Sequence, residues 1–100
     1  NLVVDMRSFP MMREIPETTL IFDATHSAQL PGGGKETGGQ RAFIPHLTRA
    51  ASAVGIDGLF IEVHDNPDQA LSDSTTQLSL KSFEQVITES LKIRACITQM

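Results

Sequence analysis

Leu20-Ile21-Phe22 and Leu59-Phe60-Ile61 are the two short apolar runs that decide how this chain folds. Each run is too short for a buried helix and is rich in strand-forming residues. A third run of the same kind, Leu2-Val3-Val4, lies near the start of the chain. Because apolar residues follow one another without polar alternation, the three runs predict parallel strands that are covered on both faces.

A helical pattern separates the second and third predicted strands. Apolar residues recur at the spacing of one helix face from about Phe43 to Val54, and Gly55 follows where a left-handed residue commonly ends a helix. Pro45 falls in the first turn of this helix, where its missing N–H is harmless. Residues 19–63 therefore predict a strand, a long loop, a helix and a parallel strand, which together form a βαβ crossover.

Two further helices complete a predicted β-α-β-α-β-α order. Residues 8–14 allow one or two helical turns, and a longer helix is expected from about Ser79 to Ile97, with Ser79 or Ser82 as its N-cap. This α/β order fits a doubly wound sheet or a section of a (β/α)8 barrel. Three strands cannot close a barrel, so we expect residues 1–100 to form a single partial domain with exposed strand edges and poor solubility.

Composition limits the possible classes of function. The net charge is −4 and the Lys and Arg residues are scattered, so nucleic acid is not an expected partner. The one cysteine, Cys96, excludes a disulfide scaffold and is expected to be a small buried thiol. No apolar run reaches the roughly 20 residues that span a membrane, and residues 1–5 lack a signal-peptide pattern, so a cytoplasmic location without membrane contact is expected. Because the chain begins inside an apolar run and not with Met, we expect it to be part of a longer protein.

Ionisable side chains follow each predicted strand at its C-terminal end. Residues two apart share one face of a strand, which groups Asp5 with Arg7, Asp23 with Ile21, and Glu62 with Phe60 and His64. In a barrel of this kind the active site lies at the C-terminal ends of the strands. The alternative is a set of buried structural ion pairs, such as Arg7 with Asp5 or with Asp23.

A possible metal site and a glycine-rich loop lie among these segments. One imidazole and two carboxylates, from His26, Glu62 and Asp73, could bind a divalent cation, although no short metal motif is present. The loop from Gln29 to Gln40 contains Pro31-Gly32-Gly33-Gly34-Lys35 and could hold an anion, form a mobile lid or simply connect two elements. Of the other histidines, His46 is expected on the surface, and His64 at the mouth of the barrel or at the polar end of a strand.

The longest sequence motifs match a known family. They are Asn1-Leu2-Val3-Val4-Asp5-Met6-Arg7, Phe22-Asp23-Ala24-Thr25-His26-Ser27-Ala28-Gln29, Gly38-Gly39-Gln40-Arg41 and Gly58-Leu59-Phe60-Ile61-Glu62-Val63-His64. On these residues, and over nearly its whole length, the chain resembles the 3-deoxy-8-phosphooctulonate synthases. The resemblance implies the C-terminal part, the last three βα units, of a (β/α)8 TIM barrel that usually forms a homotetramer.

The resemblance also implies a reaction. The family condenses phosphoenolpyruvate with arabinose 5-phosphate to give 3-deoxy-octulosonate 8-phosphate and phosphate, a transferase step in lipopolysaccharide precursor synthesis. This chain alone is expected to be incomplete and inactive. Two alternatives remain: a related 3-deoxy-heptulosonate 7-phosphate synthase, which uses erythrose 4-phosphate, and a non-catalytic fragment that only associates with partners.

Residue roles follow from the same resemblance. Metal-dependent members bind a divalent cation through Cys, His, Glu and Asp; the last three match His26, Glu62 and Asp73, and the Cys would lie in a segment outside this chain. His26 and Asp73 are expected to be catalytic as well, Asp73 through proton transfer. The expected substrate-binding residues are Gln29, Arg7 and Asp23.

Overall fold

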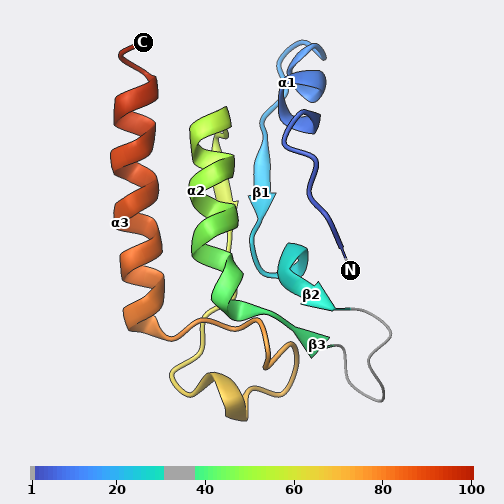
Figure 1. Ribbon diagram of the computed structural model, residues 1–100, viewed down its shortest axis with the longest axis vertical. Coiled ribbons are helices and arrows are strands. Elements are labelled where there is room, and N and C mark those ends of the chain that lie inside the picture. The colour runs from blue at the N-terminus through green and yellow to red at the C-terminus, as the bar shows by residue number, and fades with distance from the viewer. Residues whose placement is uncertain (1, 31–37) are drawn as a thin grey trace.

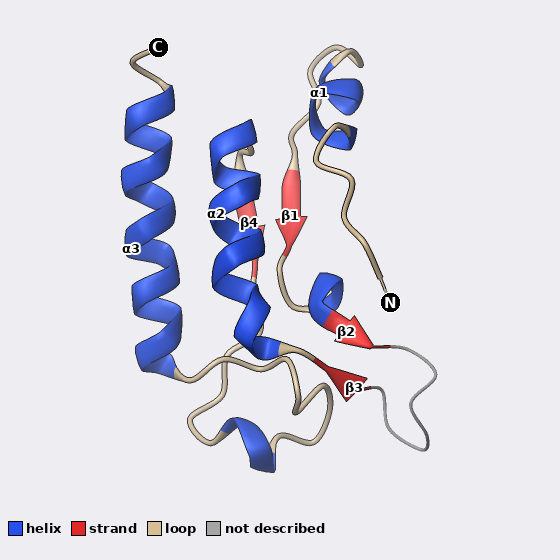
Figure 2. Ribbon diagram, in the orientation of Figure 1, coloured by secondary structure: helices blue, strands red, loops and turns tan. Residues whose placement is uncertain are grey.

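The computed structural model describes residues 2–30 and 38–100, so the expectations for the glycine-rich stretch Pro31 to Lys35 lie outside the described residues. Figure 1 shows the path of the chain, and Figure 2 shows the same view by secondary structure. The elements are α1 (Ser8–Arg13), β1 (Ile21–Asp23), η1 (His26–Ala28), β2 (Gln29–Leu30), β3 (Gly38–Gly39), η2 (Arg41–Phe43), α2 (Ile44–Val54), β4 (Gly58–Phe60), η3 (Pro67–Gln69) and α3 (Leu80–Ile97).

Strands β1 and β4 pair in parallel, and Phe22 lies opposite Leu59. The backbone continues this ladder at both ends, because Leu20 accepts from the amide of Gly58 and Phe60 accepts from the amide of Ala24. The predicted βαβ crossover is therefore confirmed, with each strand displaced by one residue from its expected bounds. β2 and β3 form a separate antiparallel pair, in which Gln29 lies opposite Gly39.

The prediction of a strand at Leu2-Val3-Val4 is wrong, because these residues adopt no regular structure. Val3 is 88% exposed and Leu2 is also exposed. A strand needs a neighbour for its backbone N–H and C=O groups. Within the described parts of the chain this segment has no such neighbour, so apolar composition alone does not make it a strand.

The helices pack on one face of the β1–β4 pair. In Figure 1, α2 and α3 lie side by side along the strands. Phe22 is buried in a core that includes Ile44, Ala51 and Val86, and its ring meets Phe9 of α1 edge to face. Side chains alternate along a strand, so the neighbours of Phe22 point the other way.

The opposite face of the strand pair is open in the described chain. Ile21 and Phe60 lie there and are exposed, although both are large apolar residues. β1 and β4 form a two-stranded sheet, so each strand also has a free edge. Further strands of a barrel would pair with these edges and enclose the open face.

Local signals set the helix ends as predicted. Gly55 follows α2 with φ +110°, which an L side chain rarely adopts, and Pro45 lies in the first turn. The side chain of Ser79 accepts a hydrogen bond from the amide of Ser82 at 3.1 Å, so Ser79 is the N-cap of α3 and the alternative at Ser82 is wrong. Among the described helices, none is both long enough and apolar enough to cross a membrane.

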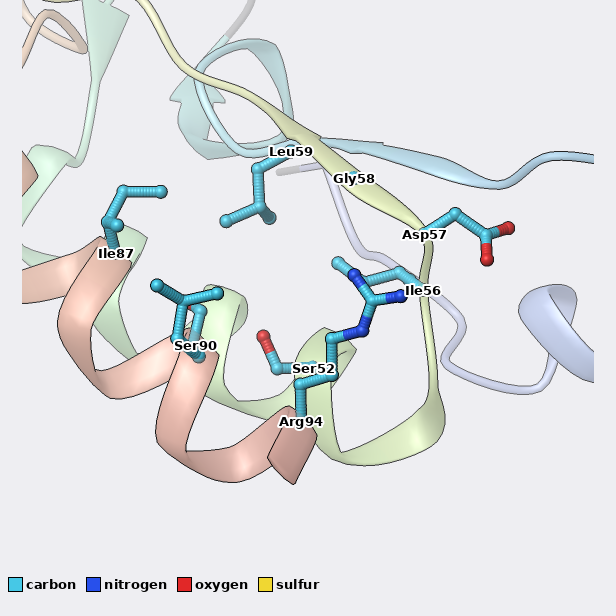
Figure 3. A pocket seen from close by; sticks show the side chains of 9 residues that line it. Ser52, Ile56, Asp57, Gly58, Leu59, Ile87, Ser90 and Arg94 are labelled. Atoms are coloured by element: carbon cyan, nitrogen blue, oxygen red, sulfur yellow. The ribbon is translucent and has the colours of Figure 1, made fainter. Parts of the chain in front are cut away.

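One face of α3 is only partly covered. A pocket of about 200 Å³ lies between β4, α2 and α3, with Leu59, Ile87 and Leu91 among its walls (Figure 3).

Cys96, near the end of α3, is exposed, so the prediction of a buried thiol is wrong. The buried residues of α3 are Val86 and Ser90, so burial does not extend to the end of the helix where Cys96 lies.

The carboxylate of Asp57 ties together the starts of β1 and β4. Its Oδ2 accepts from Arg13 Nη1 at 2.7 Å and from the backbone N–H of Leu20 at 2.8 Å. These contacts, with Arg13 the larger cause, lower the pKa of Asp57 below its usual 3.8. Because the folded pKa is lower than the unfolded one, the carboxylate stabilises the fold above pH 3.8, and this stabilisation is lost as the pH falls through the folded pKa.

Asp57→Asn is therefore expected to flatten the fall in unfolding free energy between about pH 5 and pH 3. Urea unfolding across that range measures the effect. Asp5→Asn is the matched control: Arg7 also lowers the pKa of Asp5, but the two residues are two apart and exposed, so their contact can form in the unfolded chain. An unchanged pH dependence in Asp57→Asn would contradict the assignment.

Candidate metal centre

The turn after β1 places His26. The Oδ1 atom of Asp23 accepts from the backbone N–H groups of Thr25, at 3.1 Å, and His26, at 2.9 Å. Ser27 Oγ donates to the carbonyl of Asp23 at 2.5 Å. An Asp side chain that bonds the backbone two and three residues onward turns the chain locally. The strand therefore ends at Asp23, and η1 begins at His26.

The ring of His26 is held by the same carboxylate. Its Nδ1 lies 2.8 Å from Asp23 Oδ2. A hydrogen on Nδ1 satisfies this contact and leaves the lone pair of Nε2 free for a ligand. The pKa of His26 is raised, first by the Asp23 hydrogen bond and then by the charges of Asp23, Asp73 and Glu62, which outweigh partial burial. The surroundings of this ring therefore favour a positive charge at the site.

Glu62 lies two residues beyond β4. Its backbone N–H donates to the fully buried Thr25 Oγ1 at 2.8 Å, and its carbonyl accepts from Leu78 N at 3.1 Å. Its side chain is also fixed, because Gln77 Nε2 donates to Oε2 at 2.6 Å. The other carboxylate oxygen, Oε1, lies 3.3 Å from His26 Nε2.

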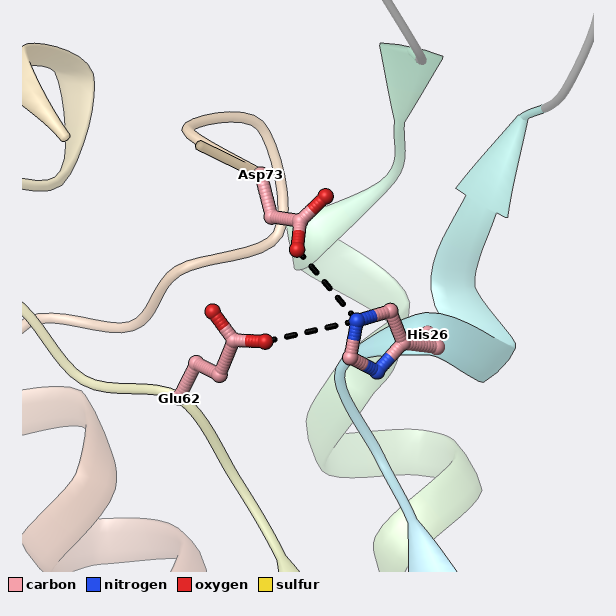
Figure 4. A group of neighbouring side chains, drawn as sticks. All are labelled: His26, Glu62 and Asp73. Carbon is pink, nitrogen blue, oxygen red and sulfur yellow. Dashed lines mark hydrogen bonds and ion pairs between the residues drawn. The ribbon is translucent and has the colours of Figure 1, made fainter. Parts of the chain in front are cut away.

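Asp73 reaches the same nitrogen from the loop that follows. Its φ of 49° is left-handed, and its carbonyl accepts from the backbone N–H groups of Thr76 and Gln77, both at 3.0 Å. Gln29 Nε2 donates to Oδ1 at 2.6 Å, while Oδ2 lies 3.3 Å from His26 Nε2. Figure 4 shows both carboxylates pointing at the imidazole.

The three side chains fit a divalent cation. One ligand atom from each of His26, Glu62 and Asp73 lies within 4.8 Å of the others, and all three residues are half-buried. One nitrogen and two oxygens are a common ligand set for zinc and similar metals. The second polar atom of each ligand is bound by Asp23, Gln77 or Gln29, which is the outer shell that orients metal ligands in proteins.

The remaining predicted site residues have different positions. Gln29 and Asp23 contact the cluster, but as partners of Asp73 and His26. The side chain of Arg7 pairs with Asp5 at 2.9 Å, which is the partner that the ion-pair alternative named, but Arg7 is 80% exposed, so the expected burial of this pair is wrong. His46 is exposed, as predicted, and contacts Arg49.

His64 lies outside the cluster, directly after the isolated parallel bridge between Val63 and Leu78. Its Nδ1 accepts from the amide of Asn66 at 2.9 Å and lies 3.1 Å from an oxygen of Asp65. Sequence reasoning missed two contributors, Thr25 and Gln77, because each contacts Glu62 only through the fold. The position of Thr25 between Asp23 and His26 was a usable signal, whereas nothing in the spacing indicates Gln77.

Comparison with known proteins gives consistent matches. The model of the DAHP synthetase I family matches residues 1–97. The chain is 52% identical over 99 residues to a 2-dehydro-3-deoxyphosphooctonate aldolase of Synechococcus sp., covering 98% of this chain and 34% of the relative. It is 53% identical over 102 residues to the protein of that name from Koribacter versatilis, covering 98% and 36%. The chain thus spans about a third of the length of these curated relatives.

The fold of this chain also resembles part of a solved structure. It is the phospho-2-dehydro-3-deoxyheptonate aldolase (DAHP synthase) of Thermotoga maritima, with a TM-score of 0.78 and 29% identity. The match covers 95% of this chain and 25% of that one. The predicted fold class, an α/β section of a (β/α)8 barrel, is confirmed by this likeness.

The contact between Thr25 and Glu62 generates a stability prediction. Thr25→Val keeps the side-chain shape but leaves the Glu62 N–H without its acceptor, so we expect a loss of about 1–3 kcal/mol in unfolding free energy. Thr48→Val is the matched control, since Thr48 is equally buried but its Oγ1 has no hydrogen-bond partner in the described chain. Urea unfolding of both variants decides, and equal losses would contradict the role of Thr25.

Proposed function

Since this chain belongs to the DAHP synthetase I family, we propose that the protein containing it condenses phosphoenolpyruvate with arabinose 5-phosphate. The products are 3-deoxy-octulosonate 8-phosphate and phosphate. Relatives at 50–53% identity, all named 2-dehydro-3-deoxyphosphooctonate aldolase, support this reaction over its alternatives. Because the chain spans about a third of those relatives, the activity is proposed for the longer protein and not for these residues alone.

We propose His26, Glu62 and Asp73 as ligands of a divalent cation. The observation that carries this assignment is the convergence of Glu62 Oε1 and Asp73 Oδ2 on His26 Nε2, both at 3.3 Å. DAHP synthases are generally metal-dependent, which agrees with such a site. When bound, a cation here would act as a Lewis acid that polarises the sugar aldehyde or a water molecule.

The chain's own residues prepare this chemistry. Asp23 fixes the ring of His26, while Gln77 and Gln29 each hold one oxygen of a carboxylate. These contacts leave the two oxygens that face His26, Glu62 Oε1 and Asp73 Oδ2, with few alternative orientations. We propose Asp73 and His26 as the catalytic residues, with the carboxylate of Asp73 taking part in proton transfer.

Substrate contacts are proposed at Gln29, Asp23 and Arg7. Gln29 and Asp23 border the cluster, where phosphoenolpyruvate would bind. Arg7 presents an exposed guanidinium, a group that recognises phosphate with paired hydrogen bonds. We further propose a homotetramer in the cytoplasm, serving lipopolysaccharide precursor synthesis.

Two alternative functions can be separated from this proposal by experiment. A 3-deoxy-heptulosonate 7-phosphate synthase is the second candidate, because the solved relative of Thermotoga maritima carries the name DAHP synthase. Comparing kcat/KM for arabinose 5-phosphate and erythrose 4-phosphate separates the two enzymes, and the proposal predicts preference for the five-carbon sugar. A non-catalytic role is the other rival, and a folded chain that binds no divalent metal would favour it.

His26→Ala tests the ligand assignment in the longer protein. We expect bound metal, measured by elemental analysis after dialysis, to fall at least about tenfold, with a parallel fall in turnover. His46→Ala on the surface of α2 is the matched control and should keep both. Unchanged metal content in His26→Ala would overturn the assignment, whatever the effect on turnover.

A further inference from the structure

The loop between β4 and α3 carries Asp73 but has little core of its own. Residues 65, 66, 68, 69, 71 and 72 are exposed, and the only regular element before Asp73 is the three-residue η3. Asp73 itself has left-handed backbone geometry, with φ 49°. A residue with a side chain keeps that conformation only where its surroundings impose it. The Thr76 and Gln77 amides of the loop hold the Asp73 carbonyl, and contacts from outside the loop add to them.

Arg41 makes two such contacts from the entry of α2. Its Nη2 donates to the carbonyl oxygen of Ser74, the residue after Asp73. Its Nη1 lies 3.2 Å from Oδ1 of Asp68, on the other side of Asp73 in the sequence. One rigid, planar guanidinium thus joins both flanks of the loop to η2.

The backbone beside Arg41 packs directly against the same loop. A Cβ added at Gly39 would clash with Thr76 Cγ2 and lie 2.7 Å from Thr75 Oγ1, so a side chain there would force these residues of the loop to shift. Gln29, which pairs with Gly39 across β2 and β3, donates to Asp73 Oδ1. The segment 39–41 therefore contacts the loop between β4 and α3 at several points, and Arg41 makes the charged contact among them.

We infer that Arg41 is a positioning residue, which holds Asp73 Oδ2 in line with His26 Nε2. The inference rests on the proposed metal site. Without the guanidinium, the Ser74 carbonyl and Asp68 lose their common partner, and the loop gains freedom at the residue next to Asp73. The affinity for the cation then falls, because part of the binding free energy is used to order the Asp73 carboxylate.

Arg49 provides a matched control for a purely structural role. It lies on α2 with a side-chain exposure of 40%, close to the 34% of Arg41, and also makes an ion pair with another element. Its Nη1 lies 2.7 Å from Glu89 Oε2 on α3. Its side chain contacts Glu89 and His46, neither of which belongs to the Asp73 loop. Loss of either arginine removes one positive charge and one ion pair with another part of the chain.

The experiment measures binding of Co²⁺ alone, by titration of its visible d–d absorption, in the longer protein that contains this chain. Four variants are compared with the parent: Arg41→Met, Arg41→Lys, Arg49→Met and His26→Ala. We expect Arg41→Met to weaken Co²⁺ binding about tenfold or more and to alter the d–d band, with Arg49→Met within about twofold of the parent. Arg41→Lys keeps one donor and should recover part of the loss. Thermal unfolding of each metal-free variant identifies any that fail to fold, and Arg41→Lys carries the test if Arg41→Met does not fold.

The outcomes separate the inference from the proposed function. If His26→Ala binds Co²⁺ as the parent does, the metal site itself is wrong. If His26→Ala loses binding while both Arg41 variants match Arg49→Met in affinity and spectrum, the metal site stands and the positioning role of Arg41 is overturned.

Discussion

The parallel pairing of β1 with β4 is the constraint on which the rest of the structure depends. Parallel strands end at the same edge of a sheet, and the register sets Asp23 opposite Phe60. The residues that follow the two strands then reach a common point. His26 comes after the turn that Asp23 makes, and Glu62 lies two residues beyond Phe60. A shift of one residue in this register would turn Glu62 toward the opposite face.

A layer of polar contacts surrounds this point and fixes its geometry. Thr25 binds the backbone of Glu62, Gln77 binds its side chain, and Gln29 binds Asp73. Because the outer atom of each ligand is already occupied, only the inner atoms face one another. Such an arrangement lowers the ordering cost of binding a cation, since few side-chain torsions remain to be fixed. The raised pKa of His26 reflects the same concentration of negative charge.

The sequence predicted the features that arise from short-range patterns. The strands near Phe22 and Leu59 and the helix ending at Gly55 follow from local composition and backbone chemistry, while the sequence left the N-cap of α3 open between Ser79 and Ser82. The three candidate ligands were predicted as residues, and their approach depends on the predicted parallel pairing. The strand and helix predictions are confirmed because each one depends on neighbours in the chain or on a single crossover, whereas the metal-ligand assignment stays a prediction.

The wrong and missing predictions depend on partners that local patterns do not reveal. Leu2-Val3-Val4 has strand composition but no neighbouring strand in the described chain. Cys96 lies just off the buried stripe of α3. Gln77 and Arg41 act across 15 and 33 positions, to Glu62 and to the Ser74 carbonyl, so their spacing carries no recognisable motif.

The central claim is that one cation binds between the two strand ends, and diffraction at the cobalt absorption edge tests it most directly. Crystals of the Co²⁺-bound protein should show an anomalous peak about 2.0–2.2 Å from His26 Nε2, with Glu62 Oε1 and Asp73 Oδ2 as further ligands. A peak on other acidic residues, such as Asp65 or Asp68 in the exposed loop, with none at His26, would contradict the account.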